Sequence, residues 1–220
     1  MKMLVIGRGK TGSLAAEVAA EGGHEVRSVG RADNLAGAAI TSDFDVAIDF
    51  TTPESALENI KHCSAKRLPL VVGTTGWHAH LHEVEQQVKD ADSVLVWGGN
   101  FSVGVNLVFE MLRVAAAAPH HGYTASITET HHIHKLDAPS GTALAMQRIL
   151  GDAAIRSVRE GDNMGRHEVT FQSDVDTITL THQAFSRRGF ALGAVKAAEW
   201  AATVRHPGIY EFSQIFRQLA

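Results

Sequence analysis

In the first half of the sequence, short apolar runs alternate with stretches of helical character. The apolar runs cover residues 3–6, 25–29, 44–49, 69–73 and 93–97, and helical stretches follow at residues 13–20, 55–64 and 80–89. Strands that alternate with helices in this way form parallel sheets, because each helix returns the chain to the start of the next strand. The pattern therefore predicts an α/β domain with helices on both faces of its sheet.

Four of the predicted strands are followed by small or polar residues that suit ligand-binding turns. These turns are Gly7-Arg8-Gly9, Phe50-Thr51-Thr52, Gly73-Thr74-Thr75-Gly76 and Gly98-Gly99-Asn100. In open α/β sheets, ligands bind beyond the carboxyl ends of the strands. We therefore expect the turns to line one binding site.

The first turn extends into the pattern G-x-G-x-x-G, as Gly7-Arg8-Gly9-Lys10-Thr11-Gly12. In a dinucleotide-binding site the first glycine makes a tight turn, the second lets the backbone approach a pyrophosphate, and the third permits close helix packing. An ordinary glycine turn is the alternative interpretation. A P-loop is not favoured, because that motif needs a glycine where this chain has Leu4. The motif predicts a nicotinamide dinucleotide with its diphosphate at the helix N-terminus.

The end of the second predicted strand bears on the choice between NADPH and NADH. An acidic residue there would bind the ribose hydroxyls of NADH, but the first candidate is Arg31. Arginine can pair with the 2′-phosphate of NADPH, and Lys10 offers a second positive charge. Asp33 follows closely, and a solvated surface role for Arg31 is the alternative. The sequence favours NADPH and leaves NADH open.

The second half of the chain has a different organisation. Helical character covers residues 103–118, 142–150 and 193–204, and strand-like alternation covers residues 124–132, 168–171 and 176–182. This order predicts an α+β domain built on an open sheet with two helices. We expect the domains to comprise residues 1–102 with 189–220, for the dinucleotide, and 103–188, for substrate binding and oligomerisation.

The segment from Glu129 to Ala143 carries the groups best suited to chemistry. It reads ETHHIHKLDAPSGTA and includes three histidines and Lys135, side chains that can donate protons. Ser140 is a good helix N-cap, and the amides of Gly141 and Thr142 would follow it at a helix start that favours carboxylates. A proton donor, an ammonium and a carboxylate site together suit reduction of a C=N or C=C bond beside a carboxylate.

Two other interpretations of this histidine cluster are possible. A His-His-x-His pattern on a strand-to-loop segment lacks the Cys or carboxylate partners of known metal sites, so we expect no metal. A solvated cluster of histidines is plausible by itself, but it leaves the Asp-Ala-Pro-Ser-Gly-Thr helix entry unexplained.

Composition excludes several function classes. The formal net charge of −4 argues against general electrostatic binding of nucleic acid, which needs concentrated basic surface. The apolar N-terminal run is too short for a signal segment or a membrane span, and no other stretch is long enough. The single cysteine, Cys63, cannot form an internal disulfide. We expect a cytoplasmic protein whose partner is a small molecule.

The sequence also resembles the dihydrodipicolinate reductase family, whose members are also named 4-hydroxy-tetrahydrodipicolinate reductases. The segment 129–143 is similar to the signature of that family. Further similarities occur in the family's order and cover most of the chain, at residues 46–54, 73–76, 100–106, 181–187 and 190–195. The glycine loop is one residue shorter than the common form, and the segments before residue 44 and around residues 155–167 are cut back.

The resemblance implies a Rossmann domain, a second domain with an open mixed sheet, and a homotetramer. It also implies NAD(P)H-dependent reduction of 4-hydroxy-tetrahydrodipicolinate, a cyclic dicarboxylate, in diaminopimelate and lysine biosynthesis. In this chain His131 and Lys135 would be catalytic, and His132, Ser140, Gly141 and Thr142 would bind substrate. The nicotinamide end of the cofactor would lie against residues that follow two strands: Gly73, Thr74, Thr75, Gly98, Gly99, Asn100 and Phe101.

Two alternatives differ in which of these residues they need. Another Rossmann oxidoreductase acting on an imine or amino acid would keep the glycine loop without the array of His131, His132 and Lys135. A non-catalytic NAD(P)-binding regulator would lose the proton donors. Both His131 and Lys135 are present, so the sequence favours the reductase.

Overall fold

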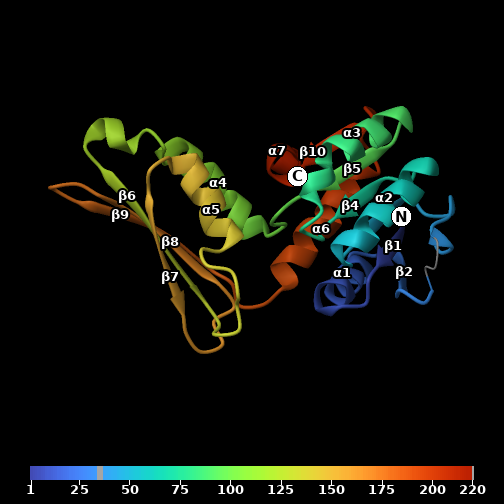
Figure 1. Ribbon diagram of the computed structural model, residues 1–220, viewed down its shortest axis with the longest axis horizontal. Helices are drawn as coiled ribbons and strands as arrows, with labels where there is room; N and C mark the ends of the chain where they lie inside the picture. Colours follow the sequence, from blue (N-terminus) through green and yellow to red (C-terminus); the bar gives the residue numbers. More distant parts are fainter. Residues whose placement is uncertain (34–36, 220) are drawn as a thin grey trace. The chain divides into compact units, whose positions relative to one another are not determined.

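The computed structural model describes residues 1–33 and 37–219 and divides the chain into two compact units (Figure 1). Unit 1 comprises Met1–Ser102 with Arg188–Ala220, and unit 2 comprises Val103–Arg187. The chain thus leaves unit 1 once, builds unit 2, and returns. None of the helices in the described ranges is long and apolar enough to cross a membrane.

Unit 1 is built on a wholly parallel sheet. Its strands are β1 (Lys2–Ile6), β2 (Glu25–Val29), β3 (Val46–Asp49), β4 (Leu70–Val72), β5 (Val94–Trp97) and β10 (Gly208–Glu211). They lie in the order β10-β5-β4-β3-β1-β2, and every neighbouring pair is parallel. The α/β class predicted from the alternation of strands and helices is confirmed.

Helices cover both faces of this sheet. On one face α1 (Lys10–Glu21) packs against α6 (Arg188–Ala201), and their alanines join a core with Met3, Val5 and Ile48. On the other face lie α2 (Pro53–Ala65) and α3 (Leu81–Asp90), which the short helix η2 (His78–His80) precedes. Two small helices, α7 (Phe212–Ile215) and η4 (Phe216–Gln218), follow β10. The strands β1, β3, β4 and β5 are almost wholly buried, which is why they appear in the sequence as apolar runs. The edge strand β2 exposes Glu25 and Arg27.

Unit 2 has a mixed sheet, as the fold class predicted. Its strands are β6 (Thr124–His131), β7 (Ala154–Arg159), β8 (Arg166–Gln172) and β9 (Thr177–Gln183), in the order β7-β6-β8-β9. The pair β6/β7 is parallel, and the other two pairs are antiparallel. The helices α4 (Val103–Ala115) and α5 (Gly141–Leu150) lie on one face, and η3 (Ala118–His121) connects α4 to β6 (Figure 1).

The opposite face of the unit 2 sheet is polar. Side chains alternate along each strand, so Ile127 and Val169 face the helices while Thr128, Thr170 and Thr179 face away. Among the described residues of unit 2, no helix lies over this second side. We call it the uncovered face, defined by Ser126, Thr128, Thr130, Glu168, Thr170, Thr179 and Thr181.

Two predicted helices differ from the structure in their ends. The helix expected over residues 103–118 ends at Ala115, because the ring of Pro119 would clash with the Ala115 carbonyl if the helix continued. The helix expected from residue 193 begins at Arg188, so Gly193 is internal. A Cβ atom at Gly193 would lie 1.7 Å from the carbonyl oxygen of Phe101, so this glycine permits close packing and does not start the helix.

Two strands were absent from the sequence-based assignment. β7 lies at a sheet edge with most of its side chains partly or fully exposed, so it has no apolar run. β10 has four residues and follows Pro207. Its pairing with β5 completes the edge of the parallel sheet, a contact that no local pattern reveals.

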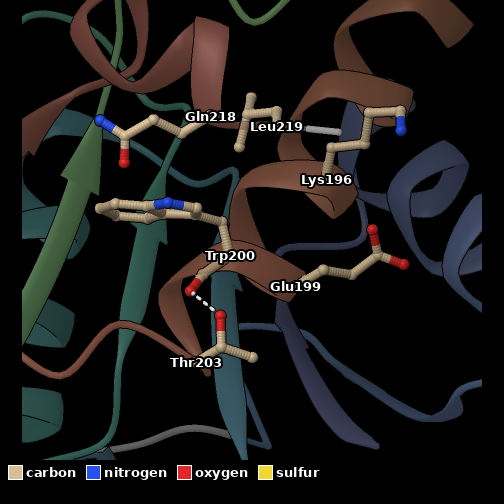
Figure 2. A pocket seen from close by; sticks show the side chains of 6 residues that line it. All are labelled: Lys196, Glu199, Trp200, Thr203, Gln218 and Leu219. Atoms are coloured by element: carbon tan, nitrogen blue, oxygen red, sulfur yellow. Dashed lines mark hydrogen bonds between the residues drawn. The ribbon is translucent and has the colours of Figure 1, made fainter.

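A pocket of about 230 Å³ opens on unit 1 beside the last turns of α6 (Figure 2). The Trp200 ring forms one wall, and Lys196 and Glu199 project from the same helix. The Thr203 hydroxyl donates to the Trp200 carbonyl oxygen at 2.9 Å. None of the residues lining this pocket belongs to the predicted dinucleotide or substrate sites, so the pocket does not bear on either assignment.

Candidate active site

The turns expected to bind the dinucleotide all follow strands of the parallel sheet. Gly7 follows β1, Arg31 lies in the turn after β2, Gly73 follows β4 and Gly98 follows β5. Because the strands are parallel, these turns share the carboxyl edge of one sheet. The structure thus brings the candidate cofactor residues of unit 1 to one edge, as the sequence pattern predicts.

The glycine loop has the geometry that a dinucleotide needs. Gly7 has a φ of +111°, a conformation that favours glycine, and its N–H donates to the Val29 carbonyl at 2.8 Å. Gly9 precedes α1, and a Cβ there would meet nothing within 4 Å. No side chain caps the start of α1, which begins with Lys10 and Thr11. The open backbone at Gly9 and this uncapped start fit a bound diphosphate.

Gly12 has a different role from Gly9. It lies in the first turns of α1, and a Cβ there would be 2.0 Å from the Gly7 carbonyl oxygen. Because the Gly7 oxygen belongs to the backbone, this clash could not be relieved by rotating a side chain. Gly12 therefore permits the helix to pack on the loop, as the third glycine of the motif predicts.

Two arginines and an aspartate lie near the end of β2. An Arg8 nitrogen lies 2.7 Å from an Asp33 oxygen, and another donates to the Ser28 carbonyl at 2.9 Å. The same Asp33 oxygen accepts the Gly30 N–H at 3.0 Å. Arg31 is exposed. The acidic group that could favour NADH is therefore already paired with a cation.

Asp49, at the end of β3, holds two of these turns together. Its fully buried carboxylate accepts hydrogen bonds from Thr74 Oγ1 and Asn59 Nδ2, both at 2.6 Å, and from the Thr51 N–H at 3.1 Å. Burial raises the pKa of Asp49, and these hydrogen bonds oppose that rise. The candidate residue Thr74 is thus held by a carboxylate that was not among the predicted site residues.

The remaining turn residues differ in how closely they are packed. A Cβ at Gly73 would lie 2.1 Å from the Phe50 ring, so a larger residue there would require that ring to move. Thr75 is exposed, whereas the Phe101 side chain is buried against Phe212, with ring centroids 4.6 Å apart. At the other turn, Gly98 and Gly99 precede Asn100, whose Oδ1 accepts the Ser102 N–H at 2.8 Å.

The candidate catalytic residues of unit 2 lie at the carboxyl end of β6. The strand ends at His131, so the next residue, His132, leaves the strand and its N–H donates to the Asn163 carbonyl at 2.7 Å. His132 Nδ1 is buried and has no hydrogen-bond partner in the described part of the chain. A buried ring nitrogen without a partner suits a substrate-binding role.

Lys135 and Ser140 lie on the loop that follows. Lys135 Nζ is 2.8 Å from Asp137 Oδ1, and this hydrogen bond lowers the pKa of Asp137. Ser140 caps α5, its hydroxyl accepting the Ala143 N–H at 3.2 Å, as predicted. Gly141 and Thr142 are the first residues of that helix. One short segment thus carries the ammonium and the helix start.

Glu129 connects these groups. It is fully buried, it bonds to His131 Nδ1, and it accepts the Ser140 N–H at 3.2 Å. Arg159, from β7, donates to both of its oxygens, at 2.8 and 3.0 Å. Burial opposes ionisation of Glu129, but hydrogen bonds, those from Arg159 first, lower its pKa to about 2. Burial lowers the pKa of His131, and the Glu129 carboxylate opposes that change.

His167, from β8, packs beside His131 with ring centroids 5.2 Å apart. Its Nε2 lies 3.1 Å from Ser140 Oγ. The Ser140 oxygen already accepts the Ala143 N–H, so its hydroxyl proton is available to His167 Nε2. Burial first, and then the neighbouring His131, lower the pKa of His167 to about 4. His167 is therefore a neutral acceptor at neutral pH.

The neutral state of His167 predicts acid-sensitive stability. A free histidine has a pKa of 6.5, so between pH 6.5 and about 4 the unfolded chain binds a proton that the folded chain does not. Stability therefore falls as the pH is lowered, by about 3 kcal/mol in total from this group. We expect His167→Gln to flatten the dependence of unfolding free energy on pH in denaturant titrations. His120→Gln, an exposed control, should leave it unchanged; equal slopes in both variants would contradict the prediction.

Sequence reasoning missed the roles of Arg159 and His167. Both are opposite the same strand: Arg159 pairs with His131 in the β6/β7 register, and His167 pairs with Glu129 in the β6/β8 register. Glu129 could have been found, because it lies two residues before His131 and so on the same face of the strand. Among the described residues, no group of three His, Cys, Asp or Glu side chains is arranged to hold a metal ion.

Comparisons with known proteins place the chain among reductases. Residues 1–101 match the family model for the dihydrodipicolinate reductase N-terminus, and residues 104–216 match the model for its C-terminus. A 4-hydroxy-tetrahydrodipicolinate reductase of Christiangramia forsetii is 37% identical over 91% of this chain and 92% of that protein. One of Saccharophagus degradans is 37% identical over 80% of this chain and 74% of that protein.

The fold has a matching solved structure. A dipicolinate-bound dihydrodipicolinate reductase from Paenisporosarcina sp. TG-14 superposes with a TM-score of 0.77 and 21% identity, covering 98% of this chain and 99% of that one. At 21% identity, the likeness to this solved structure supports the fold alone. The resemblance noted in the sequence is confirmed by the family models and the two close relatives: this chain belongs to the dihydrodipicolinate reductase family.

Proposed function

We propose that the protein reduces 4-hydroxy-tetrahydrodipicolinate to tetrahydrodipicolinate with NADPH or NADH, in diaminopimelate and lysine biosynthesis. The observation that carries the proposal is the set of groups at the end of β6, where His131, Lys135 and the Ser140 helix start follow one strand. Its relatives with 37% identity bear the name of this reductase. A proton donor, an ammonium and a helix N-terminus together suit a cyclic dicarboxylate.

The proposed reaction consumes one proton and one hydride overall. Loss of the substrate hydroxyl as water takes up one proton at oxygen and releases one from the neighbouring ring carbon, and saturation of the resulting double bond takes a further proton with the hydride. The nicotinamide supplies the hydride when it is bound. His131 and Lys135 are the proposed proton donors, and His132 would contact substrate. Ser140 and the amides of Gly141 and Thr142 would hold a substrate carboxylate against the start of α5.

The cofactor itself would be held by unit 1. The loop from Gly7 to Gly12 would hold the diphosphate through the start of α1, where the open backbone at Gly9 leaves room. The turns of Gly73–Gly76 and Gly98–Phe101 would line the nicotinamide. Asp49 supports this arrangement, because it fixes Thr74 and Thr51 by hydrogen bonds.

The direct test is a coupled assay. The purified synthase that precedes this step would generate the hydroxy-acid in place, and oxidation of NADPH or NADH would be followed by the absorbance of the reduced nicotinamide. We expect oxidation that depends on the synthase product. Failure of both cofactors to be oxidised, with folded protein, would reject the assignment.

We also propose a preference for NADPH. The carboxylate of Asp33 is occupied by Arg8 and the Gly30 N–H, which leaves the exposed Arg31 as the group that meets a 2′-phosphate. Replacing Arg31 by alanine should raise KM for NADPH about tenfold and change KM for NADH little, since a charge-assisted hydrogen bond is lost. Arg27→Ala, on the exposed side of β2, is the matched control. A parallel change in both KM values would count against this role.

The family resemblance also supports a homotetramer, and we propose the uncovered face of unit 2 as its interface. A sheet face lined by Thr128, Thr170 and Thr179 offers a flat surface to a second copy. Light scattering should give a mass near four times 23.6 kDa. Thr179→Asp, which would place like charges in a symmetric interface, should yield smaller species. An unchanged mass in this variant would remove the face from the interface.

We propose that the enzyme works in the cytoplasm. Its one cysteine, Cys63, is buried, and burial raises the pKa of its thiol, so it is an unreactive group that needs no oxidising compartment. Fractionation of cells producing the protein would test this location.

A further inference from the structure

Glu129 is a carboxylate of the candidate site in unit 2 that lies wholly inside the protein. It lies on β6 two residues before His131, with none of its surface exposed. A buried carboxylate is costly unless donors satisfy both oxygens. The cost of burying the Glu129 charge must therefore be offset by hydrogen-bond donors around it. Those donors belong to the candidate site.

Each of its oxygens serves a different half of that site. Oε2 bonds to His131 Nδ1 and accepts from an Arg159 nitrogen at 3.0 Å. Oε1 accepts from the second Arg159 nitrogen at 2.8 Å and from the Ser140 N–H at 3.2 Å. The planar guanidinium holds the carboxylate in one plane, since its two nitrogens match the two oxygens. The same Arg159 donates to the Asp137 carbonyl at 2.6 Å, which secures the loop between them.

These contacts fix which nitrogen of His131 carries the exchangeable proton. A carboxylate can only accept, so Nδ1 donates to Glu129 and Nε2 is left for proton transfer. The Ser140 N–H held by the other oxygen places the first turn of α5 relative to that imidazole. The charged and titratable groups around His131 are Glu129, Arg159, His167 and Lys135.

We infer that Glu129, held by Arg159, is the positioning residue of the reductase site. It sets the tautomer of His131 and keeps the start of α5, where the substrate carboxylate is proposed to bind, in a fixed position relative to the His131 ring. The inference rests on the proposed function. Glu129 touches neither substrate nor cofactor in this role and acts only through His131 and Ser140. It remains ionised throughout the working range, because hydrogen bonds from Arg159, Ser157 and His131 lower its pKa more than burial raises it.

Glu129→Gln tests the role while keeping the shape. The amide oxygen can still accept the Ser140 N–H, but the negative charge beside His131 is lost. The protonated imidazole then loses its partner, so the high-pH limb of the kcat profile should move down by about one pH unit or more. At neutral pH kcat should fall about 100-fold, with a much smaller change in substrate KM. Glu160→Gln, the same change at an exposed neighbour of Arg159, is the control.

The outcomes separate this inference from the proposed function. An inactive wild-type enzyme rejects the function. The positioning role is rejected if the wild type is active and Glu129→Gln keeps the wild-type pH profile of kcat. A variant in which kcat falls and KM rises while the pH profile stays in place rejects it as well. Glu129→Asp, which keeps the charge but is one methylene shorter, should restore the pH profile in part.

A measurement on the wild-type protein makes the inference independent of how the variants fold. Nitrogen-15 NMR of histidine-labelled protein, with His131→Ala to assign the resonance, reports which ring nitrogen bears the proton. The Nδ1–H tautomer is expected for neutral His131. Finding the Nε2–H tautomer would overturn the role of Glu129.

Discussion

Replacing Lys135 or His131 by alanine is expected to lower kcat by about 10²–10⁴-fold, because each removes a proton donor from the reacting centre. Lys135 Nζ lies 2.8 Å from Asp137 Oδ1, and His131, the last residue of β6, is hydrogen-bonded to Glu129. Neither side chain belongs to unit 1, where the dinucleotide is proposed to bind. Fluorescence titration should therefore give wild-type affinity for NADPH in both variants.

His134→Ala is the matched control for this pair. His134 lies on the same loop and is exposed, so its removal should leave kcat within about twofold, as for most surface changes. Near-normal kcat in both the Lys135 and His131 variants would show that the proton donors have been assigned wrongly. Loss of NADPH binding would show instead that the substitutions act through the fold.

Alanine at Gly9 and alanine at Gly12 are expected to damage the protein in two different ways. At Gly9 the added methyl meets no protein atom within 4 Å, so the fold should be unaffected, but the methyl would occupy the space that a diphosphate needs. At Gly12 it would strike the Gly7 carbonyl at 2.0 Å. Rearrangement there should cost about 1–3 kcal/mol of stability, as overpacking usually does.

Two measurements distinguish the glycine variants. Calorimetric unfolding should show a lowered midpoint for Gly12→Ala and an unchanged one for Gly9→Ala. Titration with NADPH should show at least tenfold weaker binding for Gly9→Ala, in keeping with the loss of about 1.4 kcal/mol or more of diphosphate contact. Wild-type affinity in the folded Gly9 variant would mean that the diphosphate does not lie on this loop.

How far the fold could be predicted depended on burial. Four strands of unit 1 are buried on both faces, so their sequences are largely apolar runs between turns: β1, β3, β4 and β5. β7 has no such pattern, because an edge strand with exposed side chains can hold polar residues at nearly every position. β10 owes its structure to its pairing with β5, a partner more than a hundred residues earlier in the chain.

The site could be predicted to the extent that it is local in sequence. His131, Lys135 and Ser140 occur within one short run, so their association needs no knowledge of the fold. Arg159 and His167 reach the same place only through the strand registers of β6 with β7 and β8. Neither register is fixed by the residues themselves, since both strands could pair elsewhere. The sequence therefore indicates the proposed proton donors but not the residues that hold them in place.

The return of the chain to unit 1 has a consequence for its biosynthesis. Domains form as the polypeptide leaves the ribosome, and unit 2 lies wholly between the two segments of unit 1. Met3 and Val5 are synthesised long before Ala194 and Val195 of α6, which pack in the same core. We expect unit 2 to fold first, while the parallel sheet stays incomplete with one apolar face open to chaperones. Chains truncated before α6 should therefore be degraded by proteases.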